Sequence, residues 1–252
     1  MCFELDSSPP IPVISGAAVS HEDLVLEAAD GNRFAAFLAT PEDEPTAAGV
    51  VILPDVRGLY RFYEELALRF AERGISAIAI DYFGRTAGVA KRDDDFSYME
   101  HVEQTTAEGI RADAAAAVAK LRSAGCRTIF TVGFCFGGRL SWLAAADGHG
   151  LAGAIGFYGR PGVGRDGSPG PAQRASEIAA PILGLMGGAD EGIPSEAVAD
   201  FDRALDDAGV EHEIVVYPGA PHSFFDRKYE EFASASEDAW ARVLEFIERR
   251  SG

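Results

Sequence analysis

The stretch TIFTVGFCFGG, residues 128–138, decides how this chain folds and where its chemistry lies. An apolar run of strand character ends in Gly133-Phe134-Cys135-Phe136-Gly137, and the helix-like segment RLSWLAAA follows. With sulfur in place of oxygen, this is the G-x-S-x-G pattern of a nucleophile on a tight strand-to-helix turn. Such a turn strains its central residue and leaves no room for side chains two positions away, which explains the glycines. The stretch therefore predicts Cys135 as a nucleophile.

The predicted turn also places Cys135 at the start of a helix. Free N–H groups and the helix dipole at that end favour a thiolate over a thiol. The N–H of Phe136 would face the position where a tetrahedral oxyanion forms. The alternative is that Cys135 is a small buried hydrophobic residue, as most free cysteines are.

Outward from this stretch, strand-like and helix-like segments alternate along the chain. Five further apolar runs are nearly continuous, as in strands of a parallel sheet that is covered on both faces; they are residues 49–54, 76–81, 152–159, 181–188 and 213–219. Apolar residues at helical spacing lie between them. The alternation predicts an α/β fold with a mostly parallel sheet. A hairpin with a turn at Asp30-Gly31-Asn32 precedes the first run, and Thr105-x-x-Glu108 has the form of a helix-capping box.

No repeat or linker divides the chain, so we expect a single domain over residues 19–252. Residues 1–18, rich in Pro and Ser, are expected to form an extended arm. Two long loops, 82–99 and 159–171, follow strands at their carboxyl ends, where open α/β sheets bind ligands. Each is either an ordinary surface loop or part of the site.

Composition excludes some classes of function. A net charge of −18 in 252 residues would repel nucleic acid. The three cysteines suggest neither a zinc site nor a disulfide framework, and they fit a reducing compartment. The start of the chain does not read as a signal peptide, and no apolar run is long enough to span a membrane. We therefore expect a cytoplasmic protein without nucleic-acid or membrane partners.

An acid and a base follow Cys135 in the order that this type of turn requires. Asp190 lies just after the run 181–188, and His222 lies just after the run 213–219. Glu191, next to Asp190, is a rival acid. The remaining four of the five histidines fit worse, because of their position before the turn or their local context; they are His21, His101, His149 and His212. The order and the strand context predict a Cys135–His222–Asp190 triad.

At these residues the chain resembles the dienelactone hydrolase (carboxymethylenebutenolidase) family, from about residue 20 to residue 249. The cysteine in the turn is the specific part of this resemblance. It implies the same triad in an α/β-hydrolase fold, a three-layer sandwich with an eight-stranded, mostly parallel sheet and helices on both faces. It also implies an acidic residue that contacts the resting thiol. Asp55 occupies that position, where glutamate is usual, and Val56 would supply an oxyanion-hole N–H beside Phe136.

For substrate binding, the resemblance implies arginines that hold a carboxylate. Arg85 matches one such position. The other falls on Asp226, and Arg227 follows it, while Arg57 could stand in. Tyr158 matches an aromatic residue that lines the pocket of the family, although a core role is as plausible.

Together these features predict a hydrolase that cleaves an ester or enol-lactone, of dienelactone type and carrying a carboxylate, through a cysteine acyl-enzyme. The substrate is a small molecule from the breakdown of aromatic compounds, no metal or organic cofactor is needed, and the chain is a monomer or small homo-oligomer. One alternative is a thiol esterase or lactonase for another activated ester. The other is a non-catalytic redox sensor whose thiol is oxidised reversibly.

Overall fold

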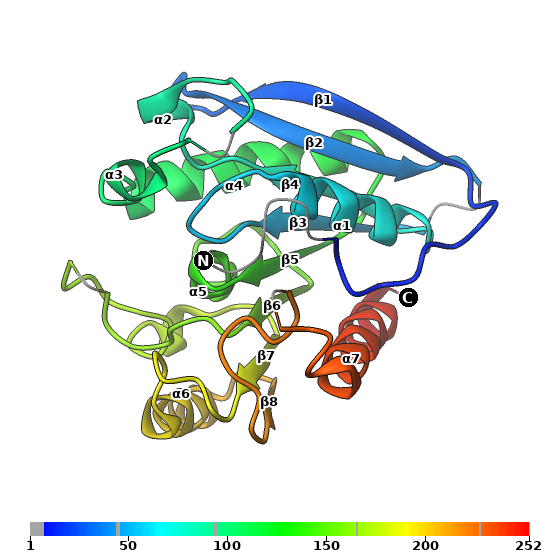
Figure 1. The fold of residues 1–252 in the computed structure, drawn as a ribbon. Coiled ribbons are helices and arrows are strands. Elements are labelled where there is room, and N and C mark those ends of the chain that lie inside the picture. Colours follow the sequence, from blue (N-terminus) through cyan, green and yellow to red (C-terminus); the bar gives the residue numbers. More distant parts are fainter. Residues whose placement is uncertain (1–7, 44–45, 93–94, 165, 227, 252) are drawn as a thin grey trace.

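The central feature is an eight-stranded sheet in the order β1-β2-β4-β3-β5-β6-β7-β8 (Figure 1). The computed structural model describes residues 8–43, 46–92, 95–164, 166–226 and 228–251. The strands are β1 Val19–Glu27, β2 Arg33–Pro41, β3 Ala48–Leu53, β4 Ser76–Ile80, β5 Thr128–Phe134, β6 Gly153–Phe157, β7 Ile182–Gly187 and β8 His212–Tyr217. β2 pairs antiparallel with β1 and β4, and all other pairs are parallel. The predicted mostly parallel, eight-stranded sheet is confirmed.

Burial follows the position of each strand in the sheet. Every residue of the inner strands β3, β4, β6 and β7 is buried, whereas the edge strand β1 is mostly exposed. This explains why the central runs are apolar on both sides, since helices cover both faces of the sheet. The predicted hairpin is confirmed as β1–β2. Gly31 adopts a φ of 84° in its turn, and Ala28 N–H bonds to Asn32 O at 2.8 Å.

Two layers of helices enclose the sheet (Figure 1). On one face, α1 (Arg61–Ala71) and α7 (Ala233–Ser251) pack large aromatic side chains against the strands, among them Phe62, Phe70, Trp240 and Phe246. On the other face lie α4 (Ala107–Ser123), α5 (Phe136–Ala144) and α6 (Ser195–Ala208). Their buried side chains form the two clusters that hold Leu121 and Trp142. The three-layer arrangement matches the expectation.

Two local expectations differ from the structure. The segment 82–99 contains one short helix, α2 (Gly84–Ala87), and the start of a second, α3 (Tyr98–Val102). Residues 93–94 lie outside the described chain. The predicted capping box is shifted by one residue. Thr105 Oγ1 donates to Val102 O at 2.7 Å and so closes α3, whereas Thr106 Oγ1 accepts from Gly109 N–H at 3.1 Å and caps α4. A single 3-10 turn, Ala175–Glu177, follows the loop 159–171.

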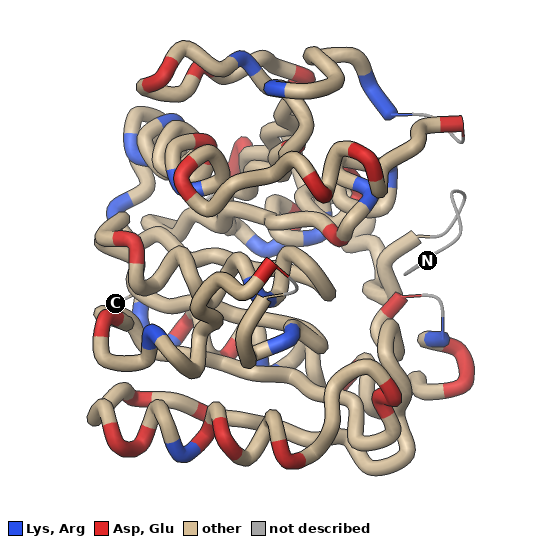
Figure 2. Tube along the Cα trace, turned by 90° about the vertical axis from the view of Figure 1, so that its left-hand side faces the viewer, with Lys and Arg blue, Asp and Glu red and all other residues tan. Residues whose placement is uncertain are grey.

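The beginning of the described chain contains neither helix nor strand from residue 8 to residue 18, and Ile11 packs into the core beside α1. The division into an arm and one domain stays a prediction. In the described part of the chain, no helix is both long and apolar enough to cross a membrane. Acidic residues are spread over the molecule, with several along α6 at the bottom of Figure 2.

Candidate active site

The parallel strands bring four of the predicted residues to one edge of the sheet. Asp55 follows β3, Cys135 follows β5, Asp190 lies just after β7 and His222 lies in the turn after β8. Because parallel strands share a carboxyl edge, segments far apart in sequence meet there.

The turn at Cys135 is as crowded as the glycine pattern predicts. Cys135 has φ 55° and ψ −110°, a backbone conformation that residues other than glycine rarely adopt. A Cβ on Gly133 would lie 1.9 Å from Gly137 O, and a Cβ on Gly137 would lie 2.0 Å from Leu53 O. Cys135 N–H bonds to Phe157 O at 3.0 Å, which ties the strained residue to β6. The glycines are therefore required by contact with the backbone.

Cys135 differs from the other described cysteine in its surroundings. Cys126 is buried, and burial raises the pKa of its thiol. Cys135 is only partly buried at the start of α5 and packs at the margin of the core. The alternative role, a small buried core residue, therefore describes Cys126 better than it describes Cys135.

The predicted base and the predicted acid are in direct contact. Nδ1 of His222 lies 2.6 Å from Asp190 Oδ2, and the Asp190 side chain is almost completely buried. The other oxygen, Oδ1, accepts from Gly192 N–H at 2.8 Å, so both carboxylate oxygens are held. Glu191, the rival acid, is exposed. Since Nδ1 faces the acid, Nε2 is the ring nitrogen that can exchange a proton with a thiol or water.

Asp55 is fully buried and is held within its own loop. Its Oδ1 accepts from Arg57 N–H at 2.9 Å and its Oδ2 lies 3.3 Å from Arg57 Nη2. Its backbone N–H donates to Tyr63 Oη at 2.9 Å. Arg57 is itself only 3% exposed. The loop is rigid for this reason, and Val56, half-buried between these two residues, is held with it.

Tyr82 contacts the Asp55 loop and the start of α5, although no motif in the sequence singles it out. Its hydroxyl donates to Pro54 O at 2.8 Å, and its ring meets that of Phe136 edge-on at 5.6 Å between centroids. Burial raises the pKa of Tyr82 well above its usual value, and the charges of Asp55, Asp81 and Cys135 add to this effect. Tyr82 therefore stays protonated between the Asp55 loop and the helix that starts after Cys135. The available signal was its position two residues after the end of β4.

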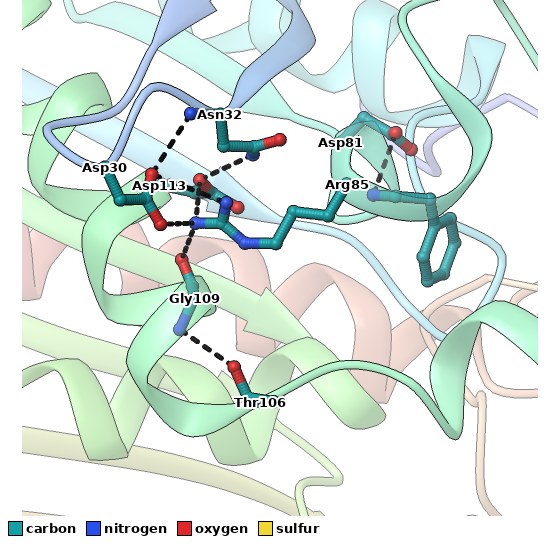
Figure 3. Close-up of polar contacts among 8 residues, drawn as sticks. Asp30, Asn32, Asp81, Arg85, Thr106, Gly109 and Asp113 are labelled. Carbon is teal, nitrogen blue, oxygen red and sulfur yellow. Dashed lines mark hydrogen bonds and ion pairs between the residues drawn. The ribbon is translucent and has the colours of Figure 1, made fainter.

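The structure does not place Arg85 as expected. Its guanidinium is surrounded by Asp30, Asp113 and the carbonyl of Gly109, as Figure 3 shows. Nη2 lies 2.9 Å from Asp30 Oδ2, 3.0 Å from Asp113 Oδ1 and 3.0 Å from Gly109 O. These contacts join the β1–β2 hairpin to α4. These contacts give Nη2 of Arg85 three acceptors within the protein and do not favour a role in holding a substrate carboxylate, which stays a prediction.

The other predicted binding residues lie near His222 or outside the described chain. Tyr158 is fully buried, its ring centroid is 4.9 Å from that of His222, and its hydroxyl donates to Asp226 Oδ2 at 2.6 Å. Arg227 is outside the described residues. Arg57 is buried beside Asp55, and its role in substrate binding stays a prediction.

Within the described chain, one group of side chains has the composition of a metal site. Ligand atoms of Asp202, Asp206 and His212 lie within 4.8 Å of one another at the surface of α6 and β8. His212 Nδ1 lies 2.7 Å from Val210 O, and its Nε2 lies 3.2 Å from Asp202 Oδ1. Both ring nitrogens of His212 therefore already have a polar neighbour within the protein. The group lies at the start of β8, whereas the predicted base His222 follows the opposite end of that strand.

Comparisons with known proteins show the family of this chain. The model of the "Dienelactone hydrolase family" matches residues 34–251. A protein of Escherichia coli (strain K12) named "Putative carboxymethylenebutenolidase" is 32% identical over 238 residues, which cover 88% of this chain and 84% of that protein. The carboxymethylenebutenolidase of Rhodococcus opacus is 28% identical, over 99% of this chain and 97% of its own length.

A solved structure leads to the same family. The crystal structure titled "Putative Dienelactone Hydrolase" from Klebsiella pneumoniae superimposes with a TM-score of 0.80 at 26% identity, over 91% of this chain and 98% of that one. The resemblance stated from the sequence, the α/β-hydrolase fold and the hydrolase class are thereby confirmed. This chain, with a cysteine in its strained turn, belongs to the dienelactone hydrolase family.

Proposed function

We infer that this protein hydrolyses an activated ester or enol-lactone through a covalent Cys135 acyl-enzyme. The observation that carries this inference is the 2.6 Å contact between His222 Nδ1 and Asp190 Oδ2, at the same sheet edge as the strained turn of Cys135. A thiol, an imidazole and a buried carboxylate in this order are the parts that nucleophilic acyl transfer requires.

In the first half of the reaction, the Cys135 thiolate attacks the carbonyl carbon of the substrate. The S–C bond forms as the carbonyl π electrons move to oxygen. The N–H groups of Val56 and Phe136 would stabilise that oxyanion, each by about 3 kcal/mol of barrier. The oxyanion then re-forms the carbonyl, the C–O bond to the leaving group breaks, and a thioester remains on Cys135.

In the second half, water attacks the thioester while His222 Nε2 takes a proton from it. Asp190 keeps the ring oriented and stabilises the imidazolium. The second tetrahedral intermediate collapses, the C–S bond breaks, and the acid leaves. The thiolate is regenerated, and the proton on His222 passes to solvent or to the product. No step uses a metal or an organic cofactor.

Sulfur restricts the substrate. A thiolate leaves a tetrahedral intermediate more readily than an alkoxide does, so simple alkyl esters tend to return to reactants. An enol ester or enol-lactone goes forward because its leaving oxygen is a stabilised enolate. This supports an enol-lactone, as in the dienelactone reaction implied by the family, over an ordinary alkyl ester.

The two candidate functions differ in the charge of the substrate, which is either a carboxylate-bearing dienelactone or a neutral activated ester. A carboxylate-bearing dienelactone needs a cationic group near the site, and Arg57 is the described candidate. A neutral activated ester is favoured by two observations: Arg85 is bound to Asp30 and Asp113, and Asp226 occupies a position where an arginine was expected. Comparing kcat/KM for a carboxylate-bearing enol-lactone and a neutral aryl ester separates the two.

Mass spectrometry of the quenched enzyme tests the mechanism. With a slowly turned-over aryl ester, we expect an acyl adduct on the peptide that contains Cys135.

Cys135→Ser should lose at least about a hundredfold in kcat/KM, because a serine lacks the thiolate nucleophile. Cys126→Ala is the matched control, since it removes the other described thiol. Absence of any acyl adduct in the wild type would instead favour the redox-sensor alternative. Location in the cytoplasm and the monomeric or small oligomeric state stay predictions.

A further inference from the structure

The turn that carries His222 is not held by its own backbone alone. Ser223, the next residue, has φ 63°, a left-handed conformation that is unfavourable for a serine. Contacts from other elements compensate for it. Ser236 Oγ, on α7, donates to Phe224 O at 3.0 Å, and Phe224 is fully buried. The position of His222 therefore depends on residues outside its own turn.

Asp190 contacts one atom of the imidazole, and this contact by itself does not set the tilt of the ring about the line between Nδ1 and Oδ2. Such a tilt would move Nε2, the nitrogen that must reach the thiol or water. A loss of about 1 Å in alignment is enough to cost about 10²-fold in rate. A contact with the face of the ring would limit this tilt.

Tyr158 supplies a contact on the ring itself. Its ring centroid lies 4.9 Å from that of His222, at an interplanar angle of 54°. Tyr158 has a φ of 37°, so its backbone is strained, and its N–H bonds to Leu185 O at 2.8 Å. The preceding carbonyl, Phe157 O, accepts the hydrogen bond from Cys135 N–H. One dipeptide at the end of β6 thus contacts both the nucleophile and the base.

The hydroxyl of Tyr158 connects the same dipeptide to the far end of the His222 turn. It donates to Asp226 Oδ2 at 2.6 Å, and Asp226 is 1% exposed. A hydrogen bond of this length to a buried carboxylate is charge-assisted and stronger than a neutral one. The His222 turn is thus held at two points: Asp190 contacts His222 at its start, and Tyr158 bonds to Asp226 at its end.

We propose that Tyr158 and Asp226 form a positioning pair that sets the orientation of the His222 ring relative to Cys135. The expected effect on kcat rests on the proposed function, whereas the expected effect on the alkylation of Cys135 does not. Tyr158 and Asp226 touch no reacting atom in this role. They act through His222.

The chain contains a matched control for this pair. Tyr217 also donates its hydroxyl to an aspartate, Asp238, at 2.8 Å. In that pair the Asp238 side chain is 45% exposed, although the Tyr217 ring is buried and packs against Phe224. Tyr158→Phe and Tyr217→Phe therefore remove the same hydroxyl from the same kind of pair, once from a ring that contacts the His222 ring and once from a ring that contacts only its turn.

The test combines steady-state kinetics on a neutral aryl ester with the pH dependence of Cys135 alkylation by iodoacetamide. For Tyr158→Phe we expect kcat to fall at least about tenfold with KM changed less than about twofold, because the substitution removes only the hydroxyl bonded to Asp226 and keeps the ring that could line the pocket. We expect the midpoint of the alkylation profile to rise, because a misoriented His222 stabilises the thiolate less. Asp226→Asn, whose amide oxygen can still accept from Tyr158, should retain more activity than Asp226→Ala.

The proposal is overturned if Tyr158→Phe keeps the kcat and the alkylation midpoint of the wild type. It is also overturned if both change no more than in Tyr217→Phe at equal loss of thermal stability, since the role would then be purely structural. Alkylation needs no ester substrate. A shifted midpoint in an enzyme that turns over no ester would therefore retain the positioning pair and reject the proposed function.

Discussion

Asp190 holds His222 by one nitrogen, Nδ1, at 2.6 Å, from a side chain that is almost completely buried. The two residues come from different strand ends, 32 positions apart in sequence. A buried carboxylate in this position fixes the tautomer of the imidazole and stabilises its protonated form. Glu191, an exposed carboxylate next to Asp190, provides a control. Neutralising Glu191 changes the net charge by the same amount without removing the contact with His222.

Asp190→Asn should lower kcat/KM by about 10³-fold, because an amide at this position favours the wrong tautomer of His222. Glu191→Gln makes the same change in charge on an exposed neighbour and should keep kcat/KM within about twofold of the wild type. Steady-state kinetics with an aryl ester measures both. Equal effects of the two substitutions would show that charge alone, and not the His222 contact, matters at this loop.

Gly137→Ala should destabilise the protein by at least about 3 kcal/mol, because its Cβ would overlap Leu53 O, a backbone atom that cannot move aside. Chemical denaturation measures the difference in free energy of unfolding. Gly162→Ala is the control. No atom lies within 4 Å of a Cβ built at Gly162, so that change should stay within about 0.5 kcal/mol. A Gly137→Ala protein of normal stability would contradict the crowding argument.

The fold could be predicted from the sequence to a large extent. The buried strands are apolar on both faces, so their runs stand out, and the observed β5, Thr128–Phe134, has the predicted bounds. The helices within 82–99 could not be predicted, because α2 and α3 have four and five residues and no amphipathic pattern develops over that length. The cap at Thr106 was misplaced by one residue, because Thr105 also precedes the helix and only the contact with Val102 O distinguishes them.

The candidate site could be predicted where chemistry and strand order coincide, as for Cys135, Asp190 and His222. The roles of Arg85 and Tyr82 could not, because they depend on partners distant in sequence. Asp113 lies 28 positions from Arg85, and Pro54 lies 28 positions from Tyr82. A side chain at a position that matches a family pattern can thus be bound to other residues of the protein, as Arg85 is to Asp30 and Asp113.

Arg85→Ala tests this reassignment. It removes the ion pair of buried Asp113, so we expect a loss of about 2 kcal/mol in the free energy of unfolding at pH 8. The ratio of kcat/KM for a carboxylate-bearing enol-lactone to that for a neutral aryl ester should stay unchanged. Arg122→Ala, which removes an arginine that bonds to His149 O at the surface, is the control for stability. A fall in the ratio for Arg85→Ala would restore Arg85 as a substrate-binding residue.

Asp113 should make stability depend on pH in a way that a single substitution removes. Burial raises the pKa of Asp113 from 3.8 to about 6, and this outweighs the opposing effects of its hydrogen bond from Asn32 and of Arg85. A carboxyl with a raised pKa in the folded state binds its proton more tightly there. Its favourable contribution is therefore complete below about pH 4 and is lost as pH rises through 6. The contribution is about 3 kcal/mol at most.

The measurement is the free energy of unfolding of the wild type minus that of Asp113→Asn, at constant ionic strength, from pH 4 to pH 8. Subtraction cancels the titration of the other acidic groups that both proteins share. We expect the difference to shift against the wild type by up to about 3 kcal/mol as pH rises. Asp30→Asn, which alters the exposed partner of Arg85, should show a much weaker dependence. A difference that stays flat across this range would mean that Asp113 is ionised at pH 5 in the folded protein, with Arg85 and Asn32 offsetting the full cost of its burial.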